Sequence, residues 1–392
     1  MCKCKIGIRN NLYYPLMLII FISIRKLDEL IIKYYCNFNK GFFIFPLLIF
    51  ISQFSAGFIS CINYKKKKDI QNNNTYSGIK LIQSKSIIIQ PDKETKIYIL
   101  MIFASYFNYV GVIARRVITD IHLENKIRGI QIIFSALLCY FTIRIKIYMH
   151  QIISLIFILL IIIIIFVYDF FIFKDKFMLL YFYGLGIFSC FSRAFLDTTE
   201  KYLFEFDYLN PYKVLMIEGL FGFLFISILF FFDSTYDDFK EFSGKDVWKL
   251  VILIICLLIH LGLTLFKNIF RVLTIKFYSP MTRALAESII DPFDFIYLII
   301  KKITGWNDEN VKKDNYDSYI AIFIALFVIS FLSFVYNDFI VLYCFGLEYN
   351  THLEIQKRSI LLDNIDGSIM DLEINSFNEE ENNNEKAEFS DQ

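Results

Sequence analysis

The segment IISLIFILLIIIIIFVY, from Ile152 to Tyr168, contains no charged residue and is apolar on every face of a helix. A surface helix of a soluble protein would carry polar residues on its outer face. Contact with lipid explains the pattern best, because about 20 helical residues cross the hydrocarbon core of a bilayer. Similar apolar blocks recur, and 56% of the 392 residues are hydrophobic. The sequence therefore predicts an integral, multi-pass protein of a lipid bilayer.

Ten segments are expected to be transmembrane helices. They are Asn11 to Ile24 with an extension to Ile32 left open, Phe42 to Ile62, Ile97 to Ile113, Gly129 to Ile143, Tyr148 to Tyr168, Phe177 to Phe204, Val214 to Phe232, Val247 to Phe270, Met281 to Ile300, and Tyr319 to Leu342. An even number of spans places both termini on one side of the membrane. A slight excess of lysine and arginine in the loops of that side assigns it to the cytosol.

Two weak sequence echoes divide the chain into halves. IRGIQIIFSALLCYF contains Arg128 and leads to FVY at Phe166, while MTRALAESIIDPF contains Arg283 and leads to FVY at Phe334. Because each half holds five spans, the two halves would be inverted in the bilayer. We therefore expect an all-α membrane protein with ten transmembrane helices as two inverted five-helix repeats. The predicted regions are a cytosolic N-terminal tail at 1–10, a first repeat at 11–173 with a flexible basic loop at 63–96, a second repeat at 174–346, and an acidic, disordered cytosolic tail at 347–392.

The segment SPMTRALAESIIDPFDFIYLII, Ser279 to Ile300, is long enough to cross a bilayer but carries Arg283, Glu287, Asp291 and Asp294. Their spacing of i, i+4, i+8 and i+11 places them on one face of a helix. Each unpaired charge near the bilayer centre would cost about 2.5 to 3.5 kcal/mol. This face is therefore expected to contact protein or water.

The preceding segment carries a matching basic stripe at His260, Lys267 and Arg271. A short connection makes the two segments antiparallel, so depths can be compared from their shared end at about 1.5 Å per residue. On that basis we expect Lys267 to form an ion pair with Glu287. His260 is expected to lie near Asp291, where an imidazole could relay a proton.

Charged residues of the sixth and seventh segments reach the same half of the membrane. The candidate substrate-binding or coupling residues are Arg193, Glu218, His260, Lys267, Glu287 and Asp291. Charges near helix ends more often extend toward water or hold helices together. We assign Arg271, Arg283, Glu200 and Lys201 to that structural group, and a purely structural role stays open for the whole cluster.

A family resemblance adds to these observations. SPMTRALAES (Ser279 to Ser288) resembles the ninth helix of nucleotide-sugar and phosphate translocators, and EKYLFEFDYLNPYKVLMIEGLFGFLF (Glu200 to Phe225) is similar to the region of helices 6 and 7 in solute carrier family 35. IRGIQIIFSALLCYF is similar to helix 4 of that group. The resemblance implies the EamA-type drug/metabolite transporter fold, with a central cavity that opens alternately to either side. The lysine–arginine pair of the nucleotide-sugar branch is replaced here by Ile290 and Asp291.

Other classes of function find little support in the sequence. The net charge is +1 and neither basic run is interleaved with aromatic residues, so we expect no nucleic-acid partner. The chain has no glycine-rich phosphate loop, HExxH or GxSxG motif, and its eight cysteines lack the spacing of a zinc site. We therefore expect no enzyme, with no catalytic residue, no metal site and no cofactor.

The predicted function is movement of a small organic metabolite by alternating access, with proton coupling left open. In the deep cluster as read from the sequence, acidic residues outnumber basic ones, which favours a neutral or amine-bearing solute. A nucleotide-sugar antiporter and a transport-inactive membrane scaffold remain alternatives. The resemblance implies an internal membrane of the Golgi, lysosome or vacuole, and a homodimer stays open.

Overall fold

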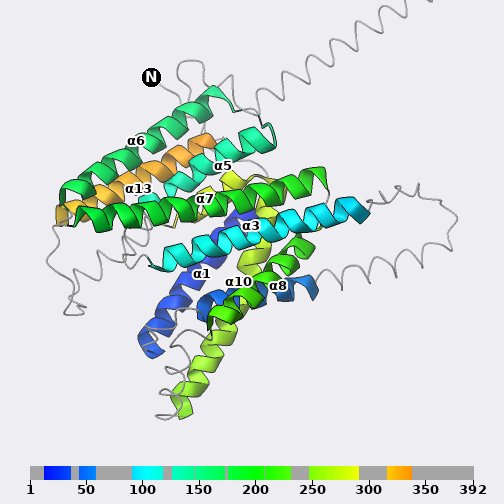
Figure 1. The fold of residues 1–392 in the computed structure, drawn as a ribbon. Coiled ribbons are helices and arrows are strands. Elements are labelled where there is room, and N and C mark those ends of the chain that lie inside the picture. Colours follow the sequence, from blue (N-terminus) through cyan, green and yellow to red (C-terminus); the bar gives the residue numbers. More distant parts are fainter. Residues whose placement is uncertain are drawn as a thin grey trace, which may run out of the picture.

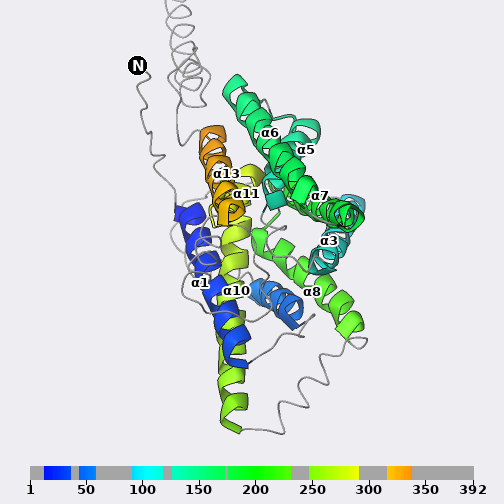
Figure 2. The same ribbon diagram turned by 90° about the vertical axis from the view of Figure 1, so that its left-hand side faces the viewer.

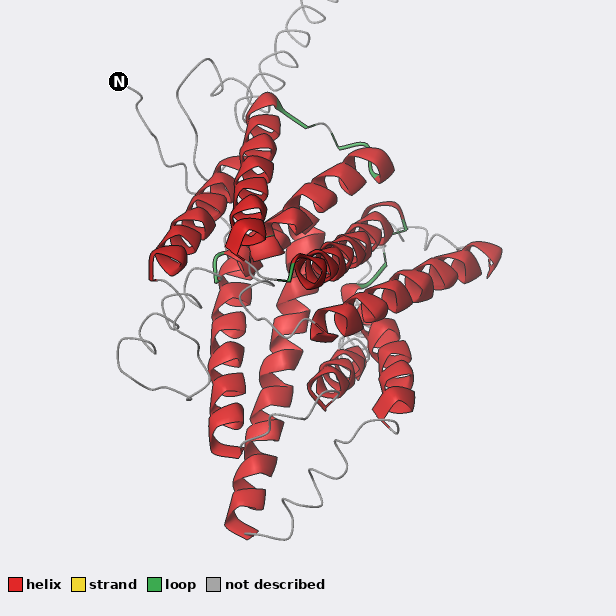
Figure 3. Cartoon of the chain, turned by 60° about the vertical axis from the view of Figure 1, so that its left-hand side comes forward, coloured by secondary structure: helices red, strands yellow, loops and turns green. Residues whose placement is uncertain are grey.

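The computed structural model describes residues 13–36, 44–58, 91–117, 126–145, 147–172, 175–207, 209–230, 247–290 and 316–337. Helices are the only regular secondary structure in these ranges (Figure 3). The predicted all-α fold is therefore confirmed for this part of the chain. The tail 1–10, most of the 63–96 loop and the tail 347–392 lie outside the described residues.

Each of the ten predicted segments overlaps a helix. These are α1 (Tyr13–Cys36), a helix at Ile44–Phe58, α3 (Pro91–Val117), α5 (Gly129–Thr142), α6 (Met149–Ile172), α7 (Lys176–Phe206), α8 (Pro211–Phe230), α10 (Val247–Phe277), α11 (Pro280–Ser288) and α13 (Tyr316–Tyr336). α3 begins inside the predicted 63–96 loop, so that loop is shorter than expected. α11 covers only the start of the predicted Met281 to Ile300, and residues 291–300 lie outside the described residues. Asp291 and Asp294 are among them, so the structure describes only Arg283 and Glu287 of the predicted charged face.

Among the described residues, five helices are long and apolar enough to cross a membrane. They are Thr95–Ala114 within α3, α6, α7, Pro211–Ile228 within α8, and α10. Apolar side chains of α6 project from the bundle, and Ile164 is 67% exposed, which suits contact with lipid. The architecture is compatible with a multi-pass membrane protein. The ten-span count and the inverted repeat remain predictions.

α11 occupies the centre of the helix bundle. It packs against α1, α5, α7, α10 and α13. α6 and α13 pack together beside α5 and α7, and α3 packs against both α7 and α8 (Figure 1). α1 lies along α10 on the other side of α11 (Figure 2). Side chains on the short α11 can therefore contact elements from both ends of the sequence.

The start of α11 is fixed by its own sequence. Ser279 caps the helix, because its hydroxyl accepts a hydrogen bond from the backbone N–H of Thr282 at 3.1 Å. Pro280 follows in the first turn, where its missing N–H would have had no partner. α10 ends at Phe277, so the connection is as short as predicted. This turn sets the rotation of α11 and directs its charged face into the bundle.

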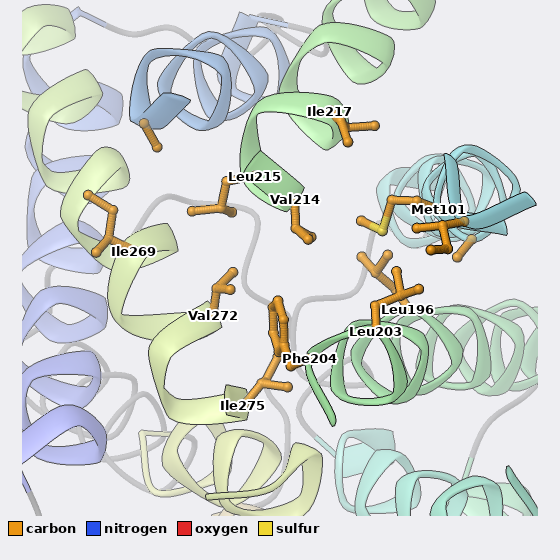
Figure 4. Packing of buried hydrophobic residues seen from close by; sticks show 13 residues of the cluster. Met101, Leu196, Leu203, Phe204, Val214, Leu215, Ile217, Ile269, Val272 and Ile275 are labelled. Carbon is orange, nitrogen blue, oxygen red and sulfur yellow. The ribbon is translucent and has the colours of Figure 1, made fainter. Parts of the chain in front are cut away.

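A cluster of buried apolar side chains joins α3, α7, α8 and α10. Met101 of α3, Leu203 of α7, Val214 of α8 and Val272 of α10 meet there (Figure 4). Burial of such side chains contributes about 1.5 to 3 kcal/mol each. The same stretches of α7, α8 and α10 carry buried charged residues, so this apolar packing fixes the backbone on which those charges are held.

α1 and α10 form an antiparallel seam. The ring of Tyr14 stacks on Phe277 with centroids 5.0 Å apart, and Phe21 stacks on Phe266 at 5.3 Å. As the residue number rises along α1, its partner's number falls along α10. The seam therefore continues toward Asp28, which lies two helical turns beyond Phe21.

A three-residue polar contact joins the start of the α5 region to α6 and α7. Both carboxylate oxygens of Asp169 lie 2.8 Å from the ammonium nitrogen of Lys126. The hydroxyl of Tyr183 donates to Asp169 Oδ2 at 2.7 Å. All three residues are buried, so the bonds hold three helical segments together.

Removing the Tyr183 hydroxyl should weaken this contact. A hydrogen bond to a charged group contributes about 1.5 to 3 kcal/mol, and we expect Tyr183→Phe to lower the free energy of unfolding by about that amount. Denaturation of the purified protein in detergent micelles measures the difference. The matched control is Tyr181→Phe, because Tyr181 is exposed on the same helix. Equal stability of the two variants would show that the Tyr183–Asp169 bond does not stabilise the fold.

Candidate functional site

Charged side chains from four helices meet inside the bundle. We call this set the central network: Arg193, Asp197 and Glu200 of α7, Glu218 of α8, Arg271 of α10, and Arg283 and Glu287 of α11. All of its members except Arg193 are buried. Such charges persist in a low-dielectric interior only when they are paired and hydrogen-bonded.

Arg271 holds the acidic part of the network together. Its Nη2 lies 2.7 Å from Glu218 Oε2 and 2.8 Å from Glu200 Oε1. Its Nη1 lies 3.5 Å from Asp197 Oδ1. One guanidinium group therefore compensates three carboxylates from two other helices, which makes Arg271 the residue on which this region depends most.

Glu287 organises the basic part of the network. Its Oε1 lies 2.6 Å from Arg193 Nη2 and 2.8 Å from Arg283 Nη2. Arg283 also donates through Nη1 to Asp197 Oδ2, which joins the basic part to the acidic part. The charges therefore form one continuous chain of ion pairs across α7, α8, α10 and α11.

Uncharged side chains from the N-terminal half complete the network. The amide of Gln53 donates to Glu218 Oε2 at 3.1 Å, and the amide of Gln131 donates to Asp197 Oδ2 at 3.3 Å. The hydroxyl of Tyr109 donates to the backbone carbonyl of Glu218. Among the described residues, the hydrogen bonds from the N-terminal half to the network come from neutral donors, and the ion pairs of the network join residues of the C-terminal half.

Lys267 lies close to the network but does not form the predicted ion pair. Within the described structure, the carboxylate of Glu287 contacts Arg193 and Arg283, and Lys267 reaches it only by longer-range electrostatic attraction. The prediction compared the depths of Lys267 and Glu287 along two helices and did not consider Arg193 of α7 as a partner of Glu287. Lys267 as a whole residue is half-buried.

Three of the residues assigned to a structural role are members of the network. Arg271, Arg283 and Glu200 are buried and paired between helices, which fits the expectation that such charges hold helices together, and they do not extend toward water. Lys201 keeps a structural role, because its ammonium group donates to the carbonyls of Lys276 and Tyr278 at the end of α10. The sequence alone could not separate these cases, since all four lie at similar distances from their helix ends.

His260 contacts Asp28, a residue that the sequence did not identify as a candidate. Its Nδ1 lies 2.8 Å from Asp28 Oδ2 on α1. The expected partner, Asp291, lies outside the described residues. The antiparallel seam between α1 and α10 accounts for the meeting, because it brings the polar segment RKLDEL of α1 beside the middle of α10.

No protein-family model matches the chain, and no curated protein matches its sequence. Among the described residues, no group of three histidine, cysteine, aspartate or glutamate side chains is placed to hold a metal ion. The function is therefore inferred from the contacts of the central network and of its neighbours.

Proposed function

We propose that the protein moves a small organic solute across a membrane by alternating access, with the solute bound beside the central network. Five helices suit a bilayer by length and composition. Buried charges are costly in such helices and usually mark a solute or ion pathway. The observation that carries the proposal is a continuous ion-pair network held between both halves of the chain.

The packing of the helices supports the inverted repeat that this mechanism needs. In a ten-helix count, α3 and α7 are the third and sixth helices, and α10 and α1 are the eighth and first. If two inverted repeats relate the first helix to the sixth and the third to the eighth, a contact between the third and sixth helices implies one between the eighth and the first. Both contacts occur, and both are extensive.

The two FVY segments make corresponding contacts. The residue after the first is Asp169, which binds Lys126 just before α5. The residue after the second is Asn337, whose Oδ1 accepts a hydrogen bond from Thr282 at the start of α11, at 2.8 Å. In each half, the polar residue after FVY therefore contacts a residue at the start of the helix that precedes it among the described helices.

A reciprocal contact joins the second and seventh helices. QFSAGF in the Ile44–Phe58 helix and EGLFGF in α8 align so that Gln53 corresponds to Glu218, and these two residues bond to each other. In the same alignment Gly57 corresponds to Gly222. Gly57 faces Met216, and Gly222 faces Phe50. Self-complementary contacts of this kind are typical of elements related by a two-fold axis.

The charge distribution favours a solute with an acidic group. The acidic side chains of the network are buried, whereas the Arg193 side chain is 20% exposed. The most accessible charged group of the network is therefore a cation. The preference for an amine-bearing solute was based on an excess of acidic residues in the cluster. Arg271 and Arg283 pair with those acidic residues, so the excess no longer supports that preference.

Uptake into liposomes tests the proposal. Purified protein should accumulate members of a panel of carboxylates, phosphate esters, amines and neutral metabolites, and we expect the carboxylates or phosphate esters to be preferred. Lys267→Met should lower that uptake at least tenfold with little loss of stability, because it breaks no ion pair among the described residues. Lys276→Met, on the exposed end of the same helix, should leave uptake unchanged.

The alternatives give different outcomes. Counter-flow restricted to nucleotide-linked sugars identifies the antiporter alternative. Absence of transport for every solute by folded protein favours the membrane scaffold and contradicts the proposal. Preferential uptake of amines contradicts the assignment of a cationic binding site.

A further inference from the structure

Asp28 of α1 and His260 of α10 form a buried pair. The imidazole is fully buried, Asp28 is 8% exposed, and Nδ1 lies 2.8 Å from Oδ2. The ring of Phe45 packs edge-on against the imidazole with centroids 5.2 Å apart, which limits the access of water. The pair is thus held in a low-dielectric environment.

The net charge of this pair depends on one proton. Among the described residues, no lysine or arginine nitrogen lies within ion-pair distance of the Asp28 carboxylate. With a neutral imidazole the pair carries a charge of −1, and with one added proton its net charge is zero. Burial disfavours an uncompensated charge, so the closed, dry contact is more stable with the proton bound.

Among the described residues, the charged groups that act on Asp28 are Glu29 and Arg25, and their effects on its carboxyl group are opposite. On α1, Arg25 and Glu29 form their own ion pair at 2.7 Å. On α10, the nearest titratable groups along the helix are Cys256 and Lys267, and the Ile44–Phe58 helix contains no titratable side chain. On α11, which also packs against α1, the charged residues Arg283 and Glu287 belong to the central network.

The pair also joins the two halves of the chain. Ion pairs of the central network lie within the C-terminal half, and the Lys126–Asp169 and Arg25–Glu29 pairs lie within the N-terminal half. Among the ion pairs formed between described residues, Asp28–His260 alone crosses from one half to the other. Its protonation therefore acts on the contact that must change when the halves move.

We propose that Asp28 and His260 form a proton-binding site that couples the α1–α10 contact to solute movement. One proton from water binds the pair while the contact is closed, and the same proton returns to water when the contact opens on the other side. This inference rests on the proposed transport function. It assigns the driving ion to α1 and α10 and leaves the solute at the central network.

Two variants and a matched control test the site. In liposomes that carry a pH gradient at constant membrane potential, wild-type uptake should rise at least fivefold over uptake without the gradient. Asp28→Asn and His260→Gln should lose this increase but retain exchange of solute between equal concentrations. Lys276→Met should behave as wild type, because Lys276 is exposed and lies about 24 Å along α10 from His260.

A spectroscopic readout needs no solute. The chain contains four histidines, so the nitrogen resonances of His260 in protein with ¹⁵N-labelled histidine can be assigned by comparison with His260→Gln. The Nδ1 resonance should respond to pH between 5 and 8 and should move in Asp28→Asn but not in Lys276→Met. An unchanged Nδ1 resonance in Asp28→Asn overturns the proton site. A titrating His260 in a protein whose uptake ignores the pH gradient overturns the coupling, whereas absence of all transport contradicts the proposed function instead.

Discussion

Arg271→Met is expected to lower the free energy of unfolding by about 3 to 5 kcal/mol, the cost of removing one partner from a buried ion pair. Arg271 compensates three carboxylates, and methionine fills a similar volume without a charge. Thermal denaturation of the purified protein in detergent measures the loss. The matched control is Lys267→Met, one turn earlier on α10, which should cost far less because Lys267 forms no ion pair among the described residues.

A second substitution can identify the carboxylate that is most affected. Asp197 keeps Arg283 and Gln131 when Arg271 is removed, and Glu218 keeps Gln53. Among the described residues, Glu200 has Arg271 as its ion-pair partner. Adding Glu200→Gln to Arg271→Met should therefore restore more stability than adding Asp197→Asn. Equal stability of the wild type and Arg271→Met would show that the network does not stabilise the fold.

The positions of the helices could be predicted because a bilayer demands long apolar segments. α6 is the clearest case, since its run from Ile152 to Tyr168 has no charged residue and the helix extends only a few residues further at each end. Local signals were equally clear where Ser279 and Pro280 begin α11. α1 was harder to delimit, because charges at Arg25 to Glu29 interrupt its apolar pattern although the helix continues to Cys36.

The partners within the site could not be predicted in the same way. Spacing along α10 and α11 placed Lys267 and Glu287 at comparable depth. In the structure, however, Glu287 forms its ion pairs with Arg193 and Arg283, because helix rotation and side-chain length also decide which groups meet. Asp28 was missed because its contact with His260 spans 232 positions and depends on the α1–α10 seam. Depth is a property of one helix, whereas pairing depends on how two helices are packed.

The contact between α8 and the Ile44–Phe58 helix predicts a large effect of a single methyl group. A Cβ at Gly219 would lie 2.1 Å from the backbone nitrogen of Phe54 and 2.7 Å from the carbonyl oxygen of Phe50. Overpacking costs about 1 to 3 kcal/mol and occasionally more, and backbone atoms cannot rotate away. We expect Gly219→Ala to reach at least about 3 kcal/mol, measured by unfolding in detergent. Gly184→Ala and Gly262→Ala have nothing within 4 Å of the added Cβ and should be neutral or slightly stabilising.

Gly222 separates a backbone clash from a side-chain clash on the same helix. A Cβ there would meet ring atoms of Phe50 at 2.3 to 2.6 Å, and a ring can change rotamer where a backbone cannot. Gly222→Ala should therefore be less damaging than Gly219→Ala and should be largely rescued by Phe50→Leu. Phe54→Leu should give no rescue of Gly219→Ala, because the obstructing atoms belong to the main chain. Similar losses for both glycines, or rescue of Gly219→Ala by Phe54→Leu, would contradict the close approach of the two helices at Gly219, and with it the geometry that brings Gln53 to Glu218.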